Sequence, residues 1–233
     1  MRYSRQLPLF GKEGQKALNN VHVAVAGCGG LGSNVITQLC MAGVKHFSLI
    51  DNDVIEESNL NRQFVHCGKT GKKVLSMRDW ILHIDPEAEV TVHDYCLTSN
   101  TVKDFLDGAD IAVDCLDSNE SRLILNEKCV KNHIPLVHGG VNGMYGQVTF
   151  ILPGFTPCLS CILGKGDGEK VSLGSAVSVI GSIQANEVIK YVTGTGKNLK
   201  GELLIINLSE NTFEKVPISR KTGCPVCGKS DSS

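Results

Sequence analysis

A glycine-rich stretch near the start of the chain has residue types and spacing suited to nucleotide binding. It reads AVAGCGGLGSN over residues 24–34, and Gly27, Gly29 and Gly32 satisfy the pattern G-x-G-x-x-G between an apolar run and a helical segment. Glycines let a phosphate approach the backbone at a helix N-terminus, and an acidic residue such as Asp51, after the second apolar run, can bond a ribose hydroxyl. The pattern predicts a nucleotide but leaves open whether it is NAD for hydride transfer or a nucleotide that is consumed.

A dense polar turn follows Asp51. The stretch DNDVIEESNLNRQF, residues 51–64, carries Asp53, Asn59, Asn61, Arg62 and Gln63. A dehydrogenase has no need of such a cluster. An enzyme that cleaves ATP must hold a triphosphate and offset the charge that shifts as pyrophosphate leaves, which suits Arg, Lys and a Mg²⁺-binding carboxylate. Arg62, Lys73 and Asp117 could supply these groups.

Lys73 and Asp117 also have simpler interpretations. Lys73 could be a solvated residue at the start of a helix, and Asp117 could cap the helix that follows it. Asp117, however, follows the fourth predicted strand, and open parallel sheets bind ligands at the carboxyl ends of their strands. Together with Arg62, these residues favour a phosphate-handling site.

Two Cys-x-x-Cys pairs indicate a metal site. Cys158, Cys161, Cys224 and Cys227 supply four thiolates, the donor set of a closed tetrahedral Zn²⁺ site that has no open position for a substrate. Such a metal would fasten the C-terminal segment to the segment after the sixth strand. Redox disulfides or a catalytic metal are the alternatives, but neither pair opens a helix in a thioredoxin-like unit.

The other six cysteines are scattered along the chain. Five of them lie in apolar or helical segments and are expected to be buried: Cys28, Cys40, Cys96, Cys115 and Cys129. Cys67 lies in a polar loop and is the one candidate for a reactive thiol.

Composition sets broad limits on partners and location. The chain has 233 residues, is 42% hydrophobic and carries a formal net charge of -1, so its overall charge attracts neither nucleic acid nor an anionic membrane. No apolar run reaches the length of about 18 residues that a membrane span needs, and Met1 leads directly into a polar stretch. We expect one domain over residues 1–233 and a cytoplasmic location.

Strand and helix signals alternate over the first two thirds of the chain. Strands are predicted at 21–26, 46–51, 89–93, 110–116 and 134–138, with helices near 31–42, 72–84, 100–106 and 119–132. This alternation is typical of a Rossmann-like α/β fold, in which a mostly parallel sheet has helices on both faces.

The pattern changes after Gly143. Three later runs, at 146–153, 201–208 and 213–218, are predicted to be antiparallel strands that extend the sheet, and an apolar helix is predicted near 176–193. We expect a mobile loop region at 155–175, centred on the glycine-rich residues 164–170, and a disordered tail at 229–233.

Six sequence features, in this order, resemble the ThiF/MoeB/HesA adenylyltransferases, relatives of the ubiquitin-activating enzymes. They are RYSRQLPLFGKEGQKAL, GCGGLGSN, IDNDVIEESNLNRQF, TGKKV, DCLDSN and the two cysteine pairs. The resemblance covers nearly the whole chain and is most specific over the first 63 residues. It implies ATP and Mg²⁺ binding, a homodimer, and adenylation of the C-terminal glycine of a small ubiquitin-like sulfur carrier in a pathway such as thiazole or molybdopterin synthesis.

The resemblance also implies roles for individual residues. Asp53 would meet the ribose, Arg62 and Lys73 the phosphates, and Asp117 the Mg²⁺, while Arg5 would reach across the dimer into the neighbouring site. Three glycines would leave room for the nucleotide, namely Gly29, Gly30 and Gly32. An ionised carboxylate needs no protein base to attack the α-phosphorus of ATP, so positioning and charge stabilisation suffice.

Three departures from the family pattern matter. Asp117 is followed by Ser118 where the family commonly has Asn, and the loop after Gln63 is short enough that Lys72 could substitute for Lys73. The stretch GKGDGEKVSLGS, residues 164–175, offers no thiol where some relatives carry a cysteine. Pure adenylation is therefore expected, with Cys67 as the alternative covalent nucleophile.

Several alternatives remain open at this point. An NAD-dependent oxidoreductase could use His138 as a proton donor, although a histidine at a strand end is more often structural. A non-catalytic subunit could retain the fold and the zinc and only bind a partner, but the set of Arg5, Arg62, Lys73 and Asp117 argues against it. A peptide or a modified tRNA could also replace the carrier, and the near-neutral composition weakly disfavours the tRNA.

Overall fold

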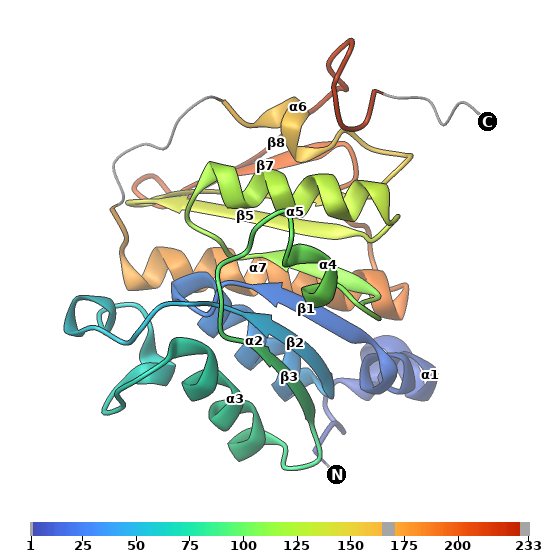
Figure 1. The fold of residues 1–233 in the computed structure, drawn as a ribbon. Helices are drawn as coiled ribbons and strands as arrows, with labels where there is room; N and C mark the ends of the chain where they lie inside the picture. The colour runs from blue at the N-terminus through green and yellow to red at the C-terminus, as the bar shows by residue number, and fades with distance from the viewer. Residues whose placement is uncertain (1, 165–170, 229–233) are drawn as a thin grey trace.

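One eight-stranded sheet organises the chain. A computed structural model describes residues 2–164 and 171–228. The strands of the sheet follow the order β3-β2-β1-β4-β5-β6-β7-β8, and helices cover both of its faces (Figure 1). The predicted α/β fold is confirmed, with its parallel core and its antiparallel C-terminal strands.

The parallel half of the sheet comes from the apolar runs of the first 142 residues. Its strands are β1 His22–Ala26, β2 His46–Ile50, β3 Glu89–His93, β4 Ile111–Asp114 and β5 Leu136–Asn142. The remaining strands pair antiparallel and are β6 Tyr145–Ile151, β7 Glu202–Asn207 and β8 Thr212–Pro217. Parallel strands with both faces covered have continuous apolar sequences, which is why the central runs were recognisable, whereas the edge strand β3, EVTVH, alternates polar and apolar residues.

Two groups of helices cover the two faces. One face packs against α1 Leu7–Asn20, α2 Gly30–Ala42, α3 Lys73–Ile84 and α7 Gly174–Thr193. The other packs against α4 Val102–Phe105, α5 Asn119–Lys131 and α6 Leu159–Ile162. Along β1, Val23 and Val25 enter the first core while Ala24 and Ala26 enter the second, as alternation in a strand requires.

The structure differs from the sequence-based elements in three helices, of which α6 lies inside the region expected to be a mobile loop. The N-terminal helix α1 was not predicted; it has Pro8 in its first turn and a kink at Gly11, whose φ is +71°. Glycines at 11 and 14 weaken the helical signal of this segment, so packing against the core supplies what propensity lacks. The helix expected at 100–106 is reduced to the four residues of α4.

Only part of the predicted mobile loop region 155–175 is described. Residues 155–164 include α6 and two of the paired cysteines, and α7 begins at Gly174. Residues 165–170 of the loop, and the tail predicted to be disordered at 229–233, lie outside the described residues. Within the described ranges, no helix combines the length and apolar character needed to cross a membrane.

Candidate functional site

A pocket of about 840 Å³ opens at the carboxyl ends of the parallel strands. Its lining brings together ten of the residues predicted from the sequence: Gly27, Gly29, Gly30, Asp51, Asp53, Asn59, Arg62, Gln63, Lys73 and Asp117. Gly32 and Arg5 are not among the lining residues. The topology therefore collects groups that lie up to ninety residues apart in the sequence, counted from Gly27 to Asp117.

The glycine loop joins β1 to the N-terminus of α2. Gly27 adopts a φ of +96°, and a Cβ on Gly32 would lie 2.0 Å from the carbonyl oxygen of Gly27. Gly32 thus allows close packing of helix on strand, and because it does not line the pocket, its predicted place beside the nucleotide stays a prediction. No side chain caps α2 at Gly29, which leaves the first turn of the helix open to an anion in the pocket.

Asp51 holds this loop against the end of β2. Its carboxylate accepts hydrogen bonds from the backbone N–H of Cys28 at 2.7 Å and from that of Asp53 at 2.8 Å. Burial raises the pKa of the Asp51 carboxyl, and these two N–H groups oppose the rise. With both oxygens engaged by backbone, Asp51 shapes the pocket wall, and Asp53 is left as the more exposed carboxylate.

The two adjacent lysines point in different directions. Lys73, the first residue of α3, is buried, and its Nζ lies 2.7 Å from Oδ2 of Asp53 inside the pocket lining. Lys72 contacts Asp94 at 3.0 Å and donates to the carbonyl of Asn52 at 2.9 Å. Of the two candidates, Lys73 is the one that lines the pocket.

Two buried amide oxygens of the polar turn have no hydrogen-bond partner among the residues that the structure describes. Asn59 and Gln63 are 8% and 3% exposed, and Oδ1 of the first and Oε1 of the second accept no hydrogen bond within the described part of the chain. An unsatisfied buried acceptor costs about 1–3 kcal/mol, so these oxygens fit a ligand that brings donors into the pocket. Beside them, Nη1 of Arg62 donates to the carbonyl of Ser58 at 3.0 Å and to Oδ1 of Asn61 at 2.8 Å.

Asp117 lies between β4 and α5 and lines the pocket. The helix cap is Ser118, whose Oγ accepts from the N–H of Ser121 at 3.3 Å. The simpler interpretation of Asp117 as the cap is therefore wrong, because the neighbouring hydroxyl serves that purpose. The carboxylate that the family pattern requires remains on the pocket wall.

Two further polar residues line the pocket and were not predicted. Arg122, in the first turn of α5, donates from Nη2 to the carbonyl of Leu116 at 2.7 Å, and its Nε lies 3.7 Å from Asp114. The sequence could have pointed to Arg122, because it lies three residues after the predicted start of a helix at 119, next to the carboxyl end of the fourth strand. Gln147 lies inside β6 and had no signal, because no local pattern marks a strand residue that faces a distant loop.

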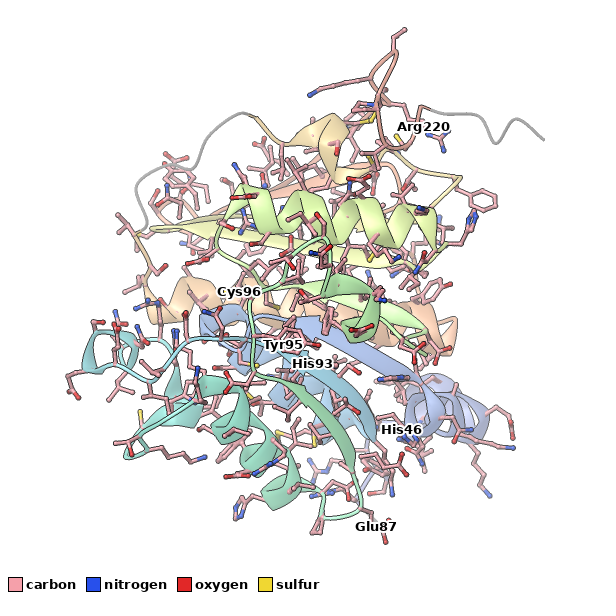
Figure 2. All side chains as sticks on the ribbon, viewed as in Figure 1. His46, Glu87, His93, Tyr95, Cys96 and Arg220 are labelled. Atoms are coloured by element: carbon pink, nitrogen blue, oxygen red, sulfur yellow. The ribbon has the colours of Figure 1, made fainter. Side chains whose placement is uncertain are left out.

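One expectation about the cysteines is wrong. Cys96 is exposed and lines the pocket, next to Tyr95 in the segment after β3 (Figure 2). This segment is a loop in which Leu97 takes the core position, so the neighbouring thiol points outward. The other four are buried as expected, and burial raises the pKa of Cys40 to about 12. Cys67 is exposed but lies outside the pocket lining.

The paired cysteines come together into a four-thiol cluster. Their sulfur atoms all lie within 4.8 Å of one another, with Cys158 and Cys224 at 3.8 Å and Cys161 and Cys227 at 3.4 Å. Zn–S bonds of about 2.3 Å in a tetrahedron place sulfurs about 3.8 Å apart, so the cluster fits Zn²⁺. Arg220 supports it by donating to the carbonyls of Gly154 and Thr156, which ties the C-terminal segment to the loop before Cys158 (Figure 2).

Zinc analysis tests this cluster directly. We expect about one Zn²⁺ per chain, and we expect Cys224→Ser to lose the metal and lower Tm by about 5 °C or more, because the C-terminal segment then loses its anchor. Cys67→Ser is the matched control and should keep its zinc. Absence of metal from the purified protein, or full zinc content and stability in Cys224→Ser, would contradict a structural zinc site at these cysteines.

Comparison with known proteins agrees with this geometry. The ThiF family model matches residues 3–226. The heterocyst protein HesA of Trichormus variabilis is 37% identical over 236 residues, covering 97% of this chain and 88% of HesA. SAMP-activating enzyme E1 of Haloferax volcanii is 34% identical over 240 residues, covering 98% and 88%. Adenylyltransferase and sulfurtransferase MOCS3 of Drosophila yakuba is 37% identical over 243 residues, and the match spans about half of it, 53%, and 97% of this chain.

Solved structures share the fold. E. coli MccB determined with ATP superposes with a TM-score of 0.87 at 24% identity, covering 98% of this chain and 75% of MccB. A Rossmann-like sheet with a polar pocket at its carboxyl edge is typical of nucleotide-binding α/β proteins. The chain belongs to the ThiF family, and it is an enzyme of the adenylyltransferase class that acts on carboxylates. The class predicted from the sequence motifs is confirmed.

Proposed function

We propose that this enzyme uses ATP and Mg²⁺ to adenylate the C-terminal glycine carboxylate of a small ubiquitin-like sulfur carrier that ends in Gly-Gly. The product would be an acyl adenylate, activated for attack by a sulfur donor in the synthesis of a sulfur-bearing cofactor such as thiamine or molybdopterin. The names of MOCS3 and of the SAMP-activating enzyme support a substrate of this kind.

The observation that carries the proposal is the convergence of Asp53, Arg62, Lys73 and Asp117 on one pocket. Two of these side chains are cationic and can hold the phosphates of ATP. Asp53 is positioned by Lys73 at the end of β2, where a ribose hydroxyl would be bonded. The orphaned oxygens of Asn59 and Gln63 suit the hydroxyls and ordered water that a nucleotide brings.

The chemistry follows from these charges. An oxygen of the substrate carboxylate attacks the α-phosphorus of ATP, a P–O bond forms, and the bond to the leaving pyrophosphate breaks. Arg62 and Lys73 stabilise the charge that accumulates on pyrophosphate, and no proton transfer is required because the carboxylate is already ionised. Mg²⁺, held by Asp117, would neutralise phosphate charge when bound.

Ligand-dependent melting separates this function from the oxidoreductase. ATP with Mg²⁺ should raise Tm by about 5 °C or more at a concentration of about 100 times its Kd, because a ligand bound only by the folded state stabilises it by mass action. NAD should have a smaller effect. An equal or larger shift with NAD would favour the oxidoreductase. The structure gives that alternative little support, since its proposed proton donor His138 is fully buried and does not line the pocket.

Arg5 is proposed to act across a homodimer. The side chain is exposed and does not line the pocket of its own chain, so a role at the phosphates requires a second subunit. Mixing Arg5→Ala chains with Asp117→Ala chains should restore activity, because each mixed dimer has one site free of both defects; random mixing would restore about a quarter of the sites. No recovery, in a sample where mixed dimers are shown to form, would exclude this role.

A peptide or a modified tRNA remains the alternative acyl substrate. The decisive measurement is exchange of labelled pyrophosphate into ATP with each class of carboxylate supplied in turn. Exchange that depends on a Gly-Gly protein supports the sulfur carrier. Exchange that depends only on a short peptide or on tRNA would show that this molecule, and not a sulfur carrier, is the substrate, and the proposed adenylation chemistry would be unchanged.

A further inference from the structure

A buried polar row crosses the sheet and ends in the pocket. On β4 and β5, Asp114 pairs with His138 in register, and both side chains are fully buried. The carboxylate of Asp114 lies 2.7 Å from Nδ1 of His138, and Nε2 of the ring lies 3.2 Å from the amide nitrogen of Gln147 on β6. Gly140 stands opposite Gln147 in register, so the side chain of Gln147 can cross to the histidine.

The row determines which way the Gln147 amide faces. The atom of Gln147 that faces Nε2 of His138, at 3.2 Å, is its amide nitrogen, which can only donate, so Nε2 accepts this hydrogen bond. The ring proton then lies on Nδ1, which donates to the carboxylate of Asp114 at 2.7 Å. The amide oxygen of Gln147, a half-buried residue of the pocket lining, is left to face the pocket.

Once the substrates fill the pocket and exclude water, an acceptor at this position takes its donor from the substrates. Phosphates and carboxylates offer only acceptors, which leaves the base, the ribose and the backbone N–H groups of the acyl substrate. The proposed ribose contact Asp53 follows β2, and β6 lies four strands away from β2 in the sheet, about 19 Å at the usual strand separation. On the other side, the cross-strand neighbour of Gln147 on β7 is Ile205, which is 39% exposed, so Gln147 lies between the pocket and an open part of the sheet.

We infer that Gln147 is a substrate-binding residue whose amide oxygen accepts a hydrogen bond from the last backbone N–H of the polypeptide substrate, and that Asp114 and His138 hold it in this orientation. This inference rests on the proposed function, because it requires a polypeptide C-terminus. The bond aligns the adjacent carboxylate for attack on phosphorus. A small acid without a terminal amide bond makes no such contact and is a poor substrate for this site.

Replacing one amide bond in the substrate by an ester tests the contact. The body of a carrier that supports pyrophosphate exchange is ligated to synthetic C-terminal tails. In the test tail the last amide linkage is replaced by an ester, which lacks the N–H, and in the control tail the linkage before it is replaced. With the wild-type enzyme, the terminal ester should lower kcat/KM about tenfold or more relative to the matched control ester, the usual effect of leaving an acceptor unpaired once the bound substrates exclude water.

Gln147→Ala is the matching enzyme variant. It should lower kcat/KM for the amide carrier by a similar factor and should respond equally to the two esters, while KM for ATP stays unchanged. Asn207→Ala, which removes an amide from the same face of the sheet outside the pocket lining, should keep the wild-type discrimination. His138→Leu frees the amide of Gln147 and should reduce the discrimination, and the Gln147 comparison stands alone if that variant fails to fold.

The outcomes separate the two proposals. Exchange with the amide carrier but equal response of the wild-type enzyme to both esters overturns the role of Gln147 and leaves the proposed function intact. Discrimination that persists in Gln147→Ala, or a raised KM for ATP alone, also overturns it, the latter by assigning Gln147 to the nucleotide. No exchange with any polypeptide carboxylate overturns the proposed function, and the role of Gln147 falls with it.

Discussion

Asp117→Ala should lower carrier-dependent exchange of pyrophosphate into ATP by at least about a hundredfold, the order of loss when one electrostatic partner of a transition state is removed. The reason is local, because this carboxylate lines the pocket on the loop after β4, where the proposed Mg²⁺ would offset the phosphate charge. Initial exchange rates at saturating ATP and carrier measure the effect. Thermal melting should show a folded protein, since Ser118 rather than Asp117 caps α5.

The exposed thiols provide controls for this result. Cys67→Ala and Cys96→Ala should both retain exchange nearly unchanged, because a carboxylate that attacks phosphorus needs no thiol nucleophile. Cys96 requires its own test because it lines the pocket, whereas Cys67 does not. A thiol-labile adduct seen by mass spectrometry that disappears with either variant, together with lost exchange, would replace pure adenylation by a covalent route. Exchange undiminished in Asp117→Ala would withdraw the proposed Mg²⁺ ligand.

Lys73→Met should lower kcat/KM for exchange by about a hundredfold, since the buried cation that we propose to hold the phosphates is lost. The matched control is the adjacent Lys72→Met, which should change the rate by less than about twofold because its pair with Asp94 is a surface contact. The two variants remove the same charge from neighbouring positions. Global charge effects therefore cancel, and only the placement of the ammonium group differs.

If Lys72→Met lowered the exchange rate more than Lys73→Met, the proposed phosphate contact would be assigned to Lys72 instead. Asp53, the partner of Lys73, is 60% exposed, so its carboxylate can be solvated when the lysine is removed. Melting temperatures of the two variants should therefore lie within a few degrees of each other. A large fall in Tm for Lys73→Met alone would show that Lys73 stabilises the fold. The exchange rate of that variant would then have to be corrected for the fraction of folded protein.

The amino-acid sequence by itself determined the features that are local or repeat at a fixed spacing. The glycine loop between strand and helix, the polar turn at 51–64 and the cysteine pairs are each contained in a short segment, so residue types and spacing suffice to predict them. The central parallel strands were also predictable, because strands buried on both faces are continuous apolar runs, and the edge strand β3 was predictable from the β-branched residues of EVTVH. The kinked helix α1 was missed, since its stability comes from packing that no local pattern encodes.

Only the tertiary structure decided the contacts made across strands and between segments. Lys72 and Lys73 are neighbours in sequence, but the start of α3 between them sends one side chain to Asp94 and the other into the pocket. The polar row from Asp114 to Gln147 joins three strands, over sequence separations of 24 and 9 residues. Such contacts depend on strand order and register, which arise from the packing of the whole sheet, and so no segment of the sequence specifies them alone.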